Sequence, residues 1–205
     1  MREKVKHLFY SLAHPVRGFY EVRHEHKGSI GIALALVLLY GISFSVNRQY
    51  ASFIVNDINP LSINSIMEVL AVIALFLLFS VGNWSITCLL DGEGRLVDIL
   101  TVTGYSLLPM VMMYIPCTFF SYLIAENEEA FYYVLIAGSI LYFIVLEVIG
   151  LMTIHNFTFG KTILIILLTI VAIFVILFLI LLLVSIVQQI ILFFGGIYDE
   201  FMLRV

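Results

Sequence analysis

The chain has 205 residues, of which 62% are hydrophobic and only 12% are charged. Soluble domains are about 45–50% apolar, so this composition excludes a soluble catalytic domain and indicates an integral membrane protein. The formal net charge of −4 is modest, and the positions of the basic residues are therefore more informative than their sum.

Residues 1–28 form a basic leader whose apolar residues recur at helical spacing. Such a segment is typical of an amphipathic stretch that lies on the inner leaflet, with aromatic rings at the headgroup level. We expect Pro15 to divide it into two short helices. A solvated basic tail that only sets the orientation of the chain is the alternative. The side chains expected at the interface are Phe9, Leu12, Arg17, Phe19 and Tyr20.

Five long apolar stretches follow the leader. A helix that spans a membrane needs about 20 consecutive apolar residues, and each stretch meets this length. The sequence therefore predicts an all-α, polytopic membrane protein with one transmembrane domain over residues 29–197. The five predicted spans are about 29–47, 69–90, 99–124, 131–154 and 162–185.

The last apolar stretch is longer than a membrane requires. Thr162–Ile197 carries no charge, and its 36 residues would make a helix of about 54 Å against a hydrocarbon core of about 30 Å. No turn signal precedes Gly195-Gly196. We expect one tilted helix that ends near Val184, an amphipathic extension over 186–197 at the interface or on a partner, and a short tail over 198–205.

The basic residues predict the orientation in the membrane. The leader holds six of the ten lysines and arginines. With five spans, a cytoplasmic N-terminus also places Arg95 and Lys161 inside, which makes eight, and leaves Arg48 and Arg204 outside. This distribution follows the positive-inside rule. We expect a multi-pass protein of the plasma membrane with its N-terminus in the cytoplasm and its C-terminus outside.

Two prolines interrupt the third predicted span. Pro109 and Pro116 remove backbone donors and free the carbonyl groups of Tyr105 and Met112 on one face of the helix. Helix breaks at membrane depth are tolerated where neighbouring groups satisfy the freed carbonyls. We expect kinks at both prolines. The face either fits its neighbours as a simple kinked helix or lines a polar cavity or docking groove.

Glu147 is the one ionisable residue inside a predicted span, which makes it a candidate functional residue. It lies seven residues from the cytoplasmic end of its span, about 10 Å deep. A carboxyl group at this depth is expected to be neutral and to donate a hydrogen bond. We predict that Asn83 or Ser106 lies within its reach. A structural hydrogen bond and a proton- or ligand-linked site are both open. The predicted buried polar layer comprises Asn83, Ser106, Glu147 and Thr169.

The sequence offers no catalytic motif. It contains no nucleophile elbow, phosphate loop or HExxH, and the pair His24/His26 has no second cluster to complete a zinc site. We therefore expect no enzymatic activity, no cofactor, no bound metal and no nucleic-acid partner.

Three segments carry a resemblance to a known family. They are "HPVRGFYEV" in the leader, "DGEGRLVDIL" followed by "GYSLLP" before Pro109, and "IHNFTFGK" after the fourth span. On these the chain resembles the Yip family of Ypt/Rab-interacting five-span proteins, and specifically its bacterial branch. The resemblance implies five helices, a cytoplasmic N-terminus and no catalytic site. Eukaryotic members act in vesicle trafficking through small GTPases, but the short leader of this chain departs from theirs.

Two functions are compatible with these features. The favoured one is a scaffold or accessory subunit that binds another membrane protein, such as a transporter complex, through its helices and its amphipathic ends. The alternative is a small-solute transporter or channel with a site at the Pro-broken third helix and Glu147. Transporters usually contain internal repeats with paired broken helices, and five spans do not divide into two halves. The oligomeric state is open.

Overall fold

The computed structural model describes residues 2–203, and every regular element in that range is helical. Met1 of the leader and Arg204 and Val205 of the tail lie outside the described residues. Five segments are long and apolar enough to cross a membrane, so the predicted all-α, five-span fold is confirmed. They are Ile30–Tyr50, Ser65–Leu89, Leu96–Phe120, Glu126–His155 and Phe159–Tyr198.

The leader folds into a helical hairpin. Helices α1 (Arg2–Ala13) and α2 (Pro15–His24) meet at His14, and Pro15 occupies the first turn of α2. A proline is favoured there because it lacks only a donor that would stay unpaired. The predicted division at Pro15 is therefore confirmed. Gly18 permits the tight hairpin, since a Cβ at this position would lie 2.5 Å from the Cα of Ser11.

The first two spans are α3 (Ile30–Tyr50) and α4 (Ser65–Leu89), which pack against each other. The side chain of Asn64 caps α4 by accepting a hydrogen bond from the N–H of Met67 at 3.2 Å. This capping satisfies one of the donors that every helix start leaves unpaired.

The third span is divided into α5 (Leu96–Ser106) and α6 (Leu108–Phe120). The break at Leu107 places Pro109 in the first turn of α6, where the proline costs no helical hydrogen bond. Pro116, in contrast, lies inside α6, and the helix continues through it. Of the two prolines, only Pro109 marks the division between the two helices.

Helix α5 is the centre of the half of the fold that contains the leader helices. It packs against α3, α4, α7 and both leader helices, and every residue from Asp98 to Ser106 except Leu100 is buried. The approach of α3 depends on Gly104, because a Cβ there would lie 2.6 Å from the Cβ and 2.8 Å from the Cα of Ala33.

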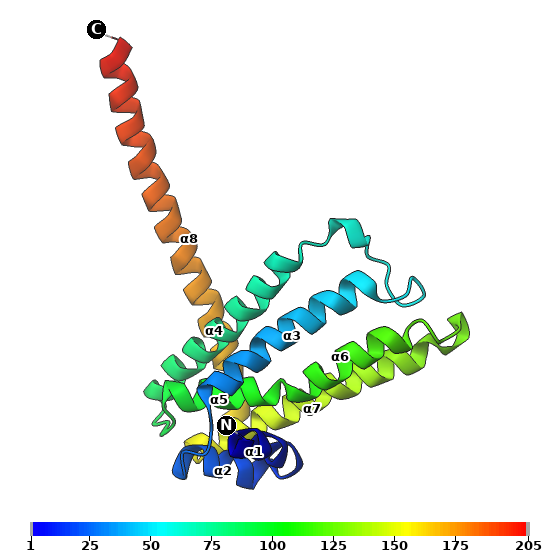
Figure 1. The fold of residues 1–205 in the computed structure, drawn as a ribbon. Coiled ribbons are helices and arrows are strands. Elements are labelled where there is room, and N and C mark those ends of the chain that lie inside the picture. The colour runs from blue at the N-terminus through cyan, green and yellow to red at the C-terminus, as the bar shows by residue number, and fades with distance from the viewer. Residues whose placement is uncertain (1, 204–205) are drawn as a thin grey trace.

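The last two spans are α7 (Glu129–His155) and α8 (Phe159–Leu203). Helix α7 packs on α5, α6 and α2, whereas α8 packs on α4 and α7 near its start and then projects away from the other helices (Figure 1). The expected helix end near Val184 is wrong, since α8 continues to Leu203. Its 45 residues make a helix of about 68 Å. Gln188 and Gln189 are good helix formers, no proline follows Val184, and the helix runs through Gly195-Gly196 as well.

Candidate functional site

Glu147 on α7 is buried in the bundle, with 6% of its surface exposed. The hydroxyl of Thr103 on α5 donates a hydrogen bond to Glu147 Oε1 at 2.8 Å. Ser106 also lies beside this carboxyl group, but its hydroxyl donates to the carbonyl of Val102 at 2.9 Å. The hydrogen-bond partner is thus Thr103, which the sequence analysis missed and which lies one turn from Ser106 on the same helix face.

Asn83 and Thr169 form a second, separate pair between α4 and α8. Asn83 Nδ2 donates to Thr169 Oγ1 at 3.1 Å, and both side chains are fully buried. The structure records no hydrogen bond from Asn83 to Glu147 among the described residues. The four candidate polar residues therefore lie in two helix-to-helix contacts, one at the α5–α7 crossing and the other at the α4–α8 crossing.

In each of these two pairs, one buried side-chain oxygen has no hydrogen-bond partner within the described part of the chain. Glu147 Oε2 and Asn83 Oδ1 have no hydrogen-bond partner among the residues that the structure describes. Most buried polar atoms in proteins are paired, so such atoms mark a point of strain or a functional site. Chemically, the two oxygens can accept a hydrogen bond, and a protonated Glu147 can also donate one.

A largely apolar cavity of about 480 Å³ lies beside the first pair, and Thr103 is part of its wall. Most of the remaining wall comes from α3 and α4, including Tyr40 and Phe76. Arg48 and Glu68 also line it and form an ion pair at 2.9 Å. The cavity wall therefore contains both the Arg48–Glu68 ion pair and the Thr103 hydroxyl that donates to Glu147.

The segments that carry the family resemblance meet at the end of the bundle that contacts the leader helix α2. The N–H of Gly94, in the loop before α5, donates to His155 Nδ1 at 3.1 Å. Arg23 of the leader donates to the carbonyl of Ile154 and forms an ion pair with Glu93 at 3.1 Å. We call Arg23, Glu93, Gly94, His155 and Lys161 the inner clasp.

Lys161 completes the inner clasp from the start of α8. Its Nζ donates to the carbonyl of Leu90 at 2.8 Å and lies 4.1 Å from the ring centroid of Phe157. The turn between α7 and α8 is made by Asn156, whose φ of 56° is left-handed, a conformation that asparagine tolerates better than most residues. The inner clasp ties the leader, the loop before α5 and the α7–α8 turn together.

The predicted interfacial residues of the leader do not share one environment. The prediction that Phe19 lies at the membrane interface is wrong. Only 1% of its surface is exposed, and its ring packs against Gly150 on α7. Leu12 is half-buried against the same core. Phe9, Arg17 and Tyr20 are exposed, so contact of these three with the membrane stays a prediction.

Metal-binding chemistry has no support in the described part of the chain, where no group of three or more histidine, cysteine, aspartate or glutamate side chains is placed to hold an ion.

Comparison with family models matches residues 9–183 to the Yip1 domain. No curated protein matches the chain, and no solved structure matches it. The match includes the leader from Phe9 onward, all of the inner clasp and the first part of α8.

Proposed function

Because this chain belongs to the Yip1 domain family, a family of non-enzymatic membrane proteins, we propose that it is a membrane-embedded accessory subunit that binds another integral membrane protein through α8. The observation that carries the proposal is the exposed C-terminal half of α8, which projects from the bundle (Figure 1).

This half of α8 is largely apolar, and between Leu177 and Ile197 its polar side chains are Ser185, Gln188 and Gln189. Every residue from Leu177 to Ile197 is exposed, and 69% of Leu181 and 74% of Leu192 are accessible. A helix that is apolar on nearly every side is normally covered, by lipid or by protein. Lipid and a partner are therefore the two candidates for covering it.

Length favours a partner over lipid alone. The uncharged run Thr162–Ile197 is about 54 Å long as a helix. Even at the upper tilt of about 40°, it spans about 41 Å, which exceeds the hydrocarbon core by about 11 Å. Apolar side chains in that excess lie in the hydrated headgroup regions unless protein covers them, and their contact with water costs up to about 25 cal/mol per Å². An apolar helix of a partner membrane protein provides this cover.

Affinity isolation in mild detergent tests this proposal with a matched pair of variants. A chain that ends at residue 185 keeps the contacts of α8 with α4 and retains a span of sufficient length. We expect the full chain to retain one membrane protein in fixed stoichiometry and the shortened chain to lose it. Leu141→Ala, which alters an exposed leucine of α7, should leave the yield unchanged.

Two results of the isolation contradict the proposal. One is equal recovery of the membrane protein with the full and the shortened chain, and the other is a full chain that elutes alone. Recovery of a second copy of this chain, distinguished by two different tags, would also contradict it by assigning α8 to self-association.

The cavity beside Thr103 supports a second candidate function, a transporter or channel for a small solute. Its wall includes the hydroxyl that binds Glu147, and carboxyl groups inside membranes often belong to substrate or proton pathways. The cavity is largely apolar, and Pro109 marks only one broken span. We therefore rank this function second.

The positions of the basic residues support a cytoplasmic N-terminus and an external C-terminus, and we propose the plasma membrane as the location. On a background lacking Cys88 and Cys117, Asn127→Cys should react with an impermeant thiol reagent in intact cells. Glu25→Cys should react only after the cells are opened. Both positions are exposed, so the reverse pattern would contradict this orientation.

A further inference from the structure

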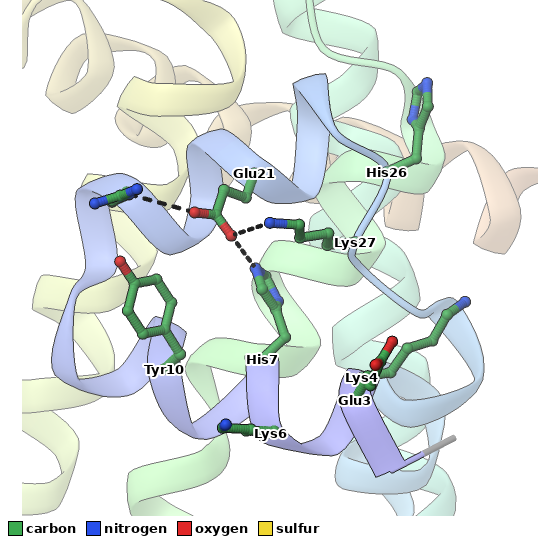
Figure 2. A pocket seen from close by; sticks show the side chains of 9 residues that line it. Glu3, Lys4, Lys6, His7, Tyr10, Glu21, His26 and Lys27 are labelled. Atoms are coloured by element: carbon green, nitrogen blue, oxygen red, sulfur yellow. Dashed lines mark hydrogen bonds and ion pairs between the residues drawn. The ribbon is translucent and has the colours of Figure 1, made fainter.

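A charged pocket of about 680 Å³ lies between the two leader helices and the segment that follows them (Figure 2). It is separate from the α8 surface and from the inner clasp. Glu21 lies at its centre, and its carboxylate faces both Lys27 and His7 (Figure 2). The cationic residues of its wall are Lys4, Lys6, Arg17 and Lys27.

Three side chains converge on Glu21. Its carboxylate lies 3.0 Å from Lys27 Nζ, 3.4 Å from His7 Nε2 and 3.4 Å from Arg17 Nε. The hydrogen bond from Lys27 is the main cause that lowers the pKa of Glu21. Glu21 is therefore a fixed anion that holds Arg17 and Lys27 at the pocket.

The pocket has more positive than negative charge. Lys4, Lys6, Arg17 and Lys27 face three carboxylates, those of Glu3 and Glu21 in the wall and that of Glu25, which lies 2.7 Å from Lys27 Nζ. Neither Lys4 nor Lys6 forms an ion pair with any residue in the described range. A concave surface with an excess of one charge concentrates ions of the opposite sign.

His7 adds a buried hydrogen-bonding group to the wall. Its side chain is 8% exposed, and its Nε2 faces the Glu21 carboxylate at 3.4 Å. Burial is the largest cause that lowers the pKa of His7 below its ordinary value of 6.5. The neutral ring carries one N–H, which on Nε2 points at Glu21 and helps to fix that carboxylate in the wall.

The leader hairpin lies beside a membrane-spanning helix. The hydroxyl of Tyr142 on α7 donates to the carbonyl of Leu12, and Arg23 donates to that of Ile154. These two contacts are about 18 Å apart along α7, so the hairpin follows its inner half. The exposed Phe9 and Val16 supply apolar contacts at the same level.

From this combination we infer that the pocket binds the phosphate group of an anionic phospholipid of the adjoining leaflet. Arginine and lysine bind the phosphate oxygens. The exposed apolar residues of the hairpin contact the acyl chains, which a free phosphate ion lacks. The inference does not depend on a partner at α8.

Native mass spectrometry of the detergent-purified full chain tests this inference. We expect phosphatidylglycerol to bind as one saturable molecule and phosphatidylcholine to bind at least about tenfold more weakly, because the choline cation offsets the phosphate charge of phosphatidylcholine and leaves no net negative charge for the pocket to attract. Arg17→Gln and Lys4→Gln should each weaken phosphatidylglycerol binding by about tenfold. Both side chains are exposed, so the variants should fold.

Arg95→Gln is the matched control. Arg95 is exposed and pairs with Asp98 as Arg17 pairs with Glu21, but it lies outside the pocket, so lipid binding should not change. Equal losses in Arg95→Gln and Arg17→Gln, or unchanged binding in both Arg17→Gln and Lys4→Gln, would overturn the inference. Displacement of the lipid by an equal concentration of inorganic phosphate would instead assign the pocket to a free anion.

Discussion

Replacing Gly104 with isoleucine is expected to prevent the bundle from folding. A Cβ at this position lies 2.6 Å, 2.8 Å and 2.9 Å from the Cβ, Cα and carbonyl oxygen of Ala33. Backbone atoms of α3 cannot move aside as the end of a flexible side chain can. We expect a loss of about 3 kcal/mol or more, measured as the change in the SDS unfolding midpoint and in the monodisperse yield.

Gly138→Ile is the control for this prediction. It makes the same substitution in the membrane-spanning helix α7, at a position where a Cβ meets nothing within 4 Å. The change in helix propensity, which favours isoleucine over glycine, is the same in both variants. Equal stability of the two proteins would show that α3 and α5 do not approach each other at Gly104.

Replacing Glu147 should separate a structural role from a chemical one. Glu147→Leu removes the acceptor of the Thr103 hydroxyl and should cost about 1–3 kcal/mol. Glu147→Gln keeps an acceptor but cannot gain or lose a proton at this position. For an accessory subunit, we expect the Gln variant to retain stability and partner recovery, measured by SDS unfolding and by affinity isolation.

Thr103→Val serves as the control for Glu147, because it removes the donor of the same hydrogen bond with little change in shape. If the hydrogen bond between Thr103 and Glu147 stabilises the protein, the double variant Thr103→Val/Glu147→Leu should lose less free energy of unfolding than the two single variants lose together. A Gln variant that is stable and binds its partner but loses the biological activity would instead favour the transporter reading.

The number of spans and the hairpin break could be predicted from the sequence because each depends on local information. Apolar runs have a length that a membrane fixes, and Pro15 permits a helix start but not a helix interior. The end of α8 could not be predicted in this way. The chain after Val184 stays apolar and contains good helix formers, so it carries no signal that distinguishes a span from its extension.

The partners inside the bundle could be predicted only in part. Counting residues from a span end gives the depth of Glu147 but not the rotation of the neighbouring helices, so Thr103 was missed in favour of Ser106. The same limit applies to Phe19. Helical spacing shows that one face of the leader is apolar, but the spacing is the same whether that face contacts lipid or α7.

Photocrosslinking from α8 in the membrane tests the docking role most directly. A benzophenone amino acid is placed at successive positions from Phe178 to Phe193, and at Leu141 on α7 as the control. We expect one protein adduct of constant mass, confined to positions three or four residues apart on one face, and none from Leu141. Lipid adducts alone at every position of α8 would contradict a partner at this helix.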